Sequence, residues 1–146
     1  MNTTTTTTTP AALAAWHHVV QYRDMAALGR LLADDVVFHS PVVHTPQRGK
    51  AITLKYLAGA MQVLNTPQFR YEREIVGARD AMLEFSTEID GTVLNGIDLI
   101  RWNADGQIID FKVMVRPLKA VNLLHQQMGA MLDRLQQGAA APGSGQ

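Results

Sequence analysis

The sequence predicts an α+β domain, because two hydrophobic periods follow one another along the chain. Apolar residues first recur at helical spacing over about residues 10–64. Four segments then alternate apolar and polar residues as half-buried strands do: 68–78, 81–89, 93–103 and 107–116. Asp-Gly pairs at 90–91 and 105–106 are strong hairpin signals between these strands. Helices followed by an antiparallel meander and a last helix are typical of the α+β class.

The first half of the chain predicts three helices and one short strand. A first helix is expected over residues 10–22, where apolar residues recur every three or four positions (Leu13, Trp16 and Val20). Asp24 is a good N-cap for a second, short helix. Residues 36–40 are β-branched and aromatic and predict a strand that ends before Pro41. A loop over 41–49 leads to a third helix over 50–64.

The end of the chain predicts a helix and a tail. After Pro117 the apolar residues share one helical face as far as about Gly138 (Val121, Leu124, Met128, Met131 and Leu135). We expect the folded domain over residues 10–137. The seven threonines within residues 1–9 and the Gly-, Ala- and Pro-rich residues 138–146 predict disordered tails.

Composition excludes several classes of partner. Thirteen basic residues balance thirteen acidic ones among 146, so the chain lacks the basic excess that nucleic acids select. The chain has no cysteine, hence no disulfide framework. No apolar run reaches membrane-span length, and residues 1–10 do not resemble a signal peptide, so we expect no membrane partner and a cytoplasmic location. Adjacent histidines such as His17 and His18 point about 100° apart on a helix, so the sequence predicts no metal site and no cofactor.

One carboxylate interrupts an apolar strand pattern. Asp98 lies in "LNGIDLIRW" and shares a strand face with Gly96, Ile100 and Trp102. In the next strand Ile109, Phe111, Val113 and Val115 form an apolar face. The alternation alone leaves open whether Asp98 faces the core or the solvent.

Three motifs carry a resemblance to a known family. "LLADDVVFHSP", "RGKAI" and "IDLIRWNADGQIIDFKVMV" resemble the ketosteroid isomerases of the nuclear transport factor 2-like (SnoaL-like) superfamily, over about residues 13–135. The resemblance implies a cone-shaped domain with three N-terminal helices packed on a curved, mostly antiparallel sheet, plus a C-terminal helix. It also implies an apolar pocket inside the cone and a homodimer formed through the outer sheet face.

The family's catalytic groups carry over only in part. Asp98 matches the buried, protonated aspartic acid that donates a hydrogen bond to an oxyanion. Trp16 stands where the family has a second donor, a tyrosine, and its indole N–H could replace that donor. Tyr56 matches a supporting tyrosine, whereas Ser40 stands where the family has its general base, an aspartate before proline. The resemblance implies a pocket wall of seven apolar residues: Phe38, Leu83, Phe85, Ile100, Phe111, Val113 and Val115.

These matches favour two functions. Burial would raise the pKa of Asp98 and leave a neutral acid able to donate a hydrogen bond. Ketosteroid isomerases are the known example of such an acid, so this expectation for Asp98 is drawn by analogy with them. A serine is too weak a base for proton shuttling, so steroid isomerisation would need another base, for which His44 in the loop is the candidate. One hypothesis is binding of a small hydrophobic carbonyl- or hydroxyl-bearing molecule, with acid–base isomerase or cyclase chemistry at Asp98. The other is a non-catalytic ligand-binding or dimerisation module. An epoxide-hydrolase mechanism is disfavoured because its second carboxylate position holds Val113.

Overall fold

The computed structural model describes the backbone of residues 9–144 and the side chains of residues 9–136, so the tract 1–8 lies outside it. Apart from the short strand β2 (Gln47–Arg48), helices and strands follow one another in the predicted order. The helices are α1 (Ala11–Tyr22), α2 (Met25–Leu31), α3 (Lys50–Leu64) and α4 (Leu118–Ser144). The strands are β1 (Leu32–His39), β2 (Gln47–Arg48), β3 (Arg70–Val76), β4 (Asp80–Ile89), β5 (Thr92–Trp102) and β6 (Ile108–Arg116).

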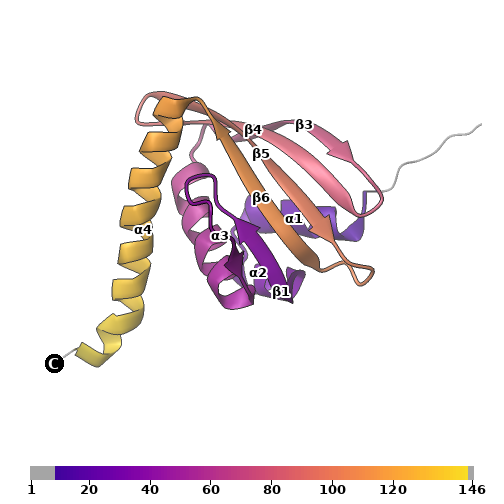
Figure 1. The fold of residues 1–146 in the computed structure, drawn as a ribbon, viewed down its shortest axis with the longest axis horizontal. Helices are drawn as coiled ribbons and strands as arrows, with labels where there is room; N and C mark the ends of the chain where they lie inside the picture. Colours follow the sequence, from indigo (N-terminus) through magenta and orange to yellow (C-terminus); the bar gives the residue numbers. More distant parts are fainter. Residues whose placement is uncertain (1–8, 145–146) are drawn as a thin grey trace, which may run out of the picture.

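The six strands form one open, mixed sheet in the order β2-β1-β6-β5-β4-β3 (Figure 1). Strands β3 to β6 are antiparallel neighbours, as the meander predicts, while β1 runs parallel to β6. This is the expected α+β architecture with a C-terminal helix, and its long strands provide the floor of the site described below.

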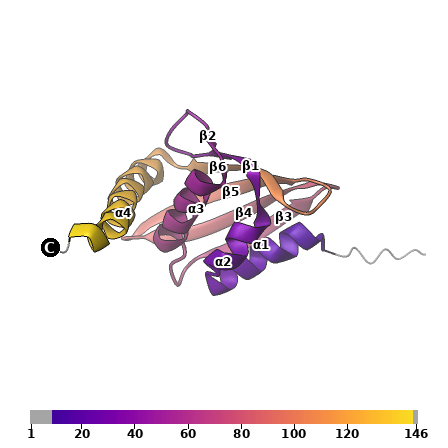
Figure 2. The same ribbon diagram turned by 90° about the horizontal axis from the view of Figure 1, so that it is seen from below.

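Helices α1, α2 and α3 pack on one face of the sheet, and α4 runs alongside α3 at one end of it (Figures 1 and 2). The core lies between these helices and the inward residues of β4, β5 and β6, among which Leu83, Ile100 and Phe111 are at most 1% exposed. None of the described helices is long and apolar enough to cross a membrane.

Local signals in the sequence account for several element boundaries. The Asp24 side chain accepts a hydrogen bond from the Ala27 N–H and caps α2, as predicted. Asp90 and Gly91 both have positive φ in the β4–β5 turn, as a two-residue hairpin of their type requires. Helix α4 continues to Ser144, so the prediction that it ends near Gly138 is wrong: a glycine alone does not stop a helix.

Two features of the sheet differ from the prediction. Strand β2 lies in the segment expected to be a loop, where Gln47 pairs with Phe38 of β1. A bulge between Arg101 and Trp102 leaves Ile109 without a partner and places Ile108 opposite Trp102. Ile108 is therefore fully buried, because the extra residue shifts the alternation of β6 by one position.

The opposite face of the sheet carries solvent-exposed apolar side chains. Val93, Leu99 and Met114 are 62%, 38% and 47% exposed. The strand register sets Met114 beside Ile97, and Leu99 beside Met82, so several of these side chains are neighbours on one surface. We call Met82, Ile97, Leu99 and Met114 the outer-face patch.

Candidate functional site

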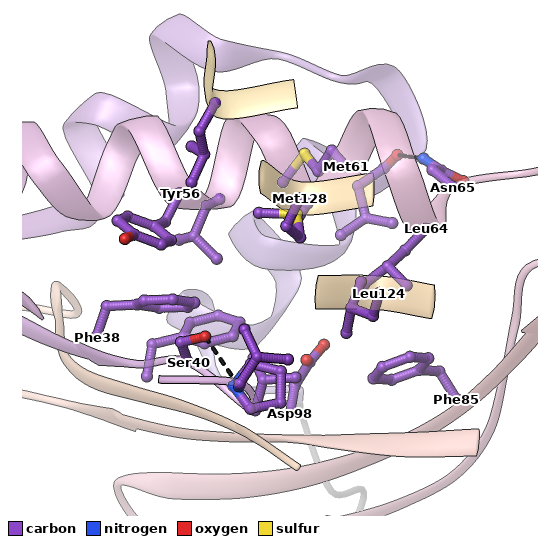
Figure 3. A pocket seen from close by; sticks show the side chains of 18 of the residues that line it. Phe38, Ser40, Tyr56, Met61, Leu64, Asn65, Phe85, Asp98, Leu124 and Met128 are labelled. Carbon is purple, nitrogen blue, oxygen red and sulfur yellow. Dashed lines mark hydrogen bonds between the residues drawn. The ribbon is translucent and has the colours of Figure 1, made fainter. Parts of the chain in front are cut away.

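A cavity of about 180 Å³ lies between the sheet, α3 and α4 (Figure 3). Its wall is mostly apolar, and the side chains that line it come from α1, β1, α3, β3, β4, β5, β6 and α4. The few polar side chains on the wall are Ser40, Tyr56, Asn65, Tyr71, Asp98 and His125. An apolar hollow with a small number of polar groups is the usual form of a small-molecule site.

Asp98 lies on the sheet floor of this cavity. The register pairs it with Leu83 of β4 and Val113 of β6, both inward-facing, so its side chain also faces inward and is 7% exposed. Two positions along β5, Gly96 leaves room for the Phe85 ring, since a Cβ there would lie 2.7 Å from the Phe85 Cζ. The structure thus answers the question that the alternation leaves open, and Asp98 belongs to the buried face.

A chain of hydrogen bonds leads to the Asp98 carboxyl group. The Trp16 Nε1–H donates to the Tyr71 hydroxyl at 3.0 Å, and the Tyr71 O–H donates to the Asp98 Oδ2 at 3.0 Å. The direction follows from chemistry: an indole N–H can only donate, so the single hydroxyl proton of Tyr71 is left for Asp98. Trp16 therefore supports Tyr71, and its N–H is engaged instead of being offered to a ligand.

Aromatic rings hold Tyr71 in this position. Its ring meets those of Phe69 and His17 edge to face, with centroids 5.1 and 5.3 Å apart. Trp16 is fixed in the same way against Phe111, at 4.8 Å. Packing of this kind fixes the hydroxyl of Tyr71 between its two partners.

Burial perturbs the acidity of both hydrogen-bonded groups. Loss of hydration raises the pKa of Asp98 from its ordinary 3.8 to about 7, against a smaller opposing effect of the Tyr71 hydrogen bond. Loss of hydration, and then the nearby Asp98 charge, raise the pKa of Tyr71 well above its ordinary value. Near neutral pH a substantial fraction of Asp98 is therefore a neutral carboxylic acid.

The second oxygen of Asp98 faces the cavity. Among the described side chains only Tyr71 hydrogen-bonds to this carboxyl group, through Oδ2. Among the described residues, Thr53 Oγ1 is the one fully buried side-chain oxygen or nitrogen that has no hydrogen-bond partner. Asp98 Oδ1 also has no partner, and it is therefore not fully buried but touches open space. Because Asp98 lines the cavity, that space is the cavity itself, and the carboxyl group points toward it in Figure 3.

Ser40 also lines the cavity, at the end of β1. Its Oγ accepts a hydrogen bond from the Val42 N–H at 3.1 Å. The hydroxyl thus fixes the turn that follows β1, which is a common local role for serine. No described histidine or carboxylate hydrogen-bonds to it, so nothing in this part of the chain activates it as a base.

The profile of one protein family, the SnoaL-like domain, matches residues 13–111, more than half of the chain. The chain belongs to the SnoaL-like family. The crystal structure of a steroid delta-isomerase from Pseudomonas aeruginosa is 38% identical, covers 90% of this chain and 93% of its own, and superposes with a TM-score of 0.76. A protein with a cystatin-like fold from Silicibacter pomeroyi is 33% identical over 83% of this chain and 84% of its own, with a TM-score of 0.77.

More distant structures share the fold of this SnoaL-like chain. A nuclear transport factor 2-like protein from Mesorhizobium loti is 22% identical, covers 73% of this chain and 88% of its own, and has a TM-score of 0.63. Among curated proteins, none matches the chain. The family assignment supports the resemblance seen in the three sequence motifs.

The structure gathers most of the predicted residues of this SnoaL-like site. Tyr56 of α3 lines the cavity and packs on Phe38, with ring centroids 5.5 Å apart. The other predicted wall residues that reach the cavity are Phe85, Phe111 and Val113.

Three predicted wall residues lie elsewhere. Leu83 and Ile100 face inward but are covered completely by the core, and neither lines the cavity. Val115 is half-buried near the end of β6, beside Gly96, and also lies outside the wall. Period-two alternation identifies the inward face of a strand, but it does not tell which inward residues are covered by helices.

His44 does not lie at the cavity. Pairing of Gln47 with Phe38 folds the loop back on β1, and His44 at its tip is exposed to solvent. The neighbouring Pro41, Val42 and Val43 line the cavity in its place. The structure therefore places His44, the candidate base, away from the cavity.

The cavity wall includes residues that the sequence analysis does not identify, among them the polar Tyr71 and His125. Tyr71 lies on β3, whose burial pattern is nearly all exposed, so the alternation gives no sign that one side chain reaches the core. His125 of α4 is exposed to solvent and also lines the cavity. The one signal for His125 is its place next to Leu124, at the edge of the apolar face of the last helix.

Proposed function

We propose that the cavity binds a small hydrophobic molecule that carries a carbonyl or hydroxyl oxygen, and that Asp98 hydrogen-bonds to that oxygen. The observation that carries the proposal is a buried carboxyl group with one oxygen held by Tyr71 and the other facing an apolar cavity. A neutral acid bonded through Oδ2 carries its own proton on Oδ1, where it can be donated to a ligand.

The same arrangement supports acid–base chemistry of the isomerase or cyclase type. When a base removes a proton from the carbon next to a carbonyl, negative charge develops on the oxygen, and a donor in an apolar site stabilises that charge. Asp98 would be the donor that touches the ligand. Tyr71 and Trp16 would be positioning residues, and Tyr56 would shape the wall beside the reacting group. The similarity to a steroid delta-isomerase makes a steroid ketone a reasonable first substrate to test.

Classical steroid isomerisation is expected to be slow. The position before Pro41 holds Ser40, whose hydroxyl is bonded to the Val42 N–H and has a far higher pKa than a carboxylate. Transfer of a proton from one carbon to another requires a base that accepts and returns it. The chain therefore has the features of the oxyanion donor without the carboxylate base that the family resemblance would pair with it.

A non-catalytic ligand-binding or dimerisation module is the second candidate. The apolar outer-face patch (Met82, Ile97, Leu99 and Met114) supports a homodimer formed through the sheet, since apolar side chains grouped on a surface mark contact sites. In this case Asp98 would serve to orient a ligand. In the ligand-binding form of this candidate the bound molecule is left unchanged, whereas the first candidate converts it.

A titration followed by a turnover assay tests the proposal. Steroids, terpenoids and aromatic polyketides would be titrated into the Trp102→Phe variant, in which the fluorescence of the cavity residue Trp16 reports occupancy. We expect saturable binding of a ketone that weakens in the additional Asp98→Asn variant. Binding that is unchanged by Asp98→Asn would contradict a role for the carboxyl group. Conversion of a β,γ-unsaturated steroid ketone to its conjugated isomer, followed by absorbance, would then separate catalysis from binding.

A further inference from the structure

Helix α4 closes one side of the cavity. It packs on α3, and its residues Leu124, His125, Met128, Gly129 and Leu132 belong to the cavity wall. Figure 3 shows Leu124 and Met128 of α4 in the space between α3 and the sheet. A ligand that enters the cavity from this side must pass an edge of this helix.

Two of these α4 residues are exposed to solvent and also border the cavity, namely His125 and Gly129. They are four positions apart and therefore lie one above the other on the same helix face. Leu124 and Met128, by contrast, are at most 8% exposed. The boundary between cavity and solvent on α4 thus runs along His125 and Gly129.

Gly129 leaves this boundary open. A Cβ added to Gly129 would meet no atom within 4 Å, so a side chain at this position would project into open space at the edge of the cavity. Gly59 of α3 differs, because a Cβ there would lie in ordinary van der Waals contact with Met131, at 3.4 Å. Glycine is a poor residue for a helix interior, and no close contact at position 129 requires it.

His125 supplies a polar group at the same place. No described residue forms a hydrogen bond or an ion pair with its ring, and it is the one basic side chain on the cavity wall. An imidazole N–H donates readily to a carboxylate or carbonyl oxygen. The opening is therefore apolar on the cavity side and has a hydrogen-bond donor at its rim.

We propose that a ligand enters through the opening beside Gly129 and leaves an acceptor group, preferably a carboxylate, at the His125 ring. This rests on the proposed binding function, in which the oxygen at the other end of the ligand lies at Asp98. The chemical class is then an elongated apolar molecule with an oxygen function at each end. His125 would determine specificity without taking part in a reaction at Asp98.

Calorimetric titration with two matched steroids tests this inference. The probes are 3-oxoandrost-4-ene-17β-carboxylate and its methyl ester, which share one apolar body and one ketone. We expect the acid to bind about fivefold more tightly, a modest charge-assisted gain at an exposed rim, and the His125→Leu variant, which has no donor, to lose that preference. Equal affinities of acid and ester in both proteins would overturn the role of His125.

A leucine at position 129 tests the opening itself. We expect Gly129→Leu to weaken binding of both probes about tenfold or more, because its side chain would fill the empty space. Gly29→Leu on α2 is the matched control: a Cβ there also meets no atom within 4 Å, and Gly29 does not line the cavity. Circular dichroism would verify that both variants stay folded.

The outcomes separate the two proposals. Unchanged affinity of Gly129→Leu for probes that bind the wild-type protein would overturn the proposed opening and leave the binding function intact. Binding of neither probe by the wild-type protein, while other ketones in the panel bind, would overturn the proposed ligand class alone. Binding of no ketone at all would overturn the binding function, and this inference with it.

Discussion

Replacement of Asp98 by asparagine should change how the stability of the protein depends on pH. Asparagine has nearly the same shape as a neutral aspartic acid and can still accept the Tyr71 hydrogen bond, but it cannot ionise. The wild-type carboxyl group must ionise inside an apolar cavity when the pH rises. The two proteins should therefore differ little in acid and diverge toward neutral pH.

The magnitude follows from the pKa of Asp98, which burial raises from 3.8 to about 7. Below about pH 4 the carboxyl group is protonated in both the folded and the unfolded chain. Between about pH 4 and 7 the unfolded chain releases the proton while the folded chain keeps it, so the free energy of unfolding falls as the pH rises. Above about pH 7 both states are ionised and the fall is complete. At about 1.4 kcal/mol for each pKa unit, the total loss is about 4 kcal/mol.

Urea unfolding at pH values from 4 to 8 would measure this effect. We expect the stability of Asp98→Asn relative to wild type to grow by about 4 kcal/mol across the series. Asp105→Asn, which removes an exposed carboxylate from the β5–β6 turn, is the control and should show a nearly constant difference. A flat difference for Asp98→Asn as well would refute the account of a desolvated carboxyl group.

Three further predictions concern other parts of the molecule. Tyr71→Phe leaves the Trp16 N–H and the Asp98 Oδ2 without their partner. Denaturant unfolding at pH 5 should therefore show a free energy of unfolding lower by about 1–3 kcal/mol. An unchanged midpoint would mean that the hydrogen-bonded chain contributes nothing to stability. Ser40→Asp places a carboxylate beside the cavity and should raise the rate of steroid isomerisation about 10²-fold or more over wild type. Ser40→Ala is the matched control. Equal rates in all three proteins would show that the missing base does not limit turnover. Leu99→Glu puts a charge into the outer-face patch and should shift the sedimentation coefficient from that of a dimer to that of a monomer. A wild-type protein that is already monomeric at micromolar concentration would contradict the dimer prediction.

Much of the fold can be predicted from local chemistry. Asp24 predicts the start of α2, and the Asp-Gly pairs predict both hairpins, because each signal acts within a few residues. The parallel pairing of β1 with β6 and the bulge after Arg101 depend on segments far apart in the chain. The short strand β2 has too few residues to show any period of its own.

The same contrast between local signals and long-range contacts applies to the residues of the site. The family resemblance identifies Asp98 and Ser40 from two separate sequence motifs. Tyr71 is not predicted, because it lies on an edge strand whose other residues are mostly exposed, and only tertiary packing brings its hydroxyl between Trp16 and Asp98. His44 is mistaken for a cavity residue, since its distance in sequence from Ser40 does not reveal that the loop turns outward.

The central claim is that Asp98 donates a hydrogen bond to an oxygen of the bound ligand, and infrared spectroscopy can measure that bond directly. The probe would be androst-4-ene-3,17-dione labelled with ¹³C at its C3 carbonyl, bound to wild type and to Asp98→Leu, which has the same branched shape and no donor. The account predicts a C3 carbonyl stretch at lower frequency in the wild-type complex than in the Asp98→Leu complex. The same frequency in both complexes would contradict it.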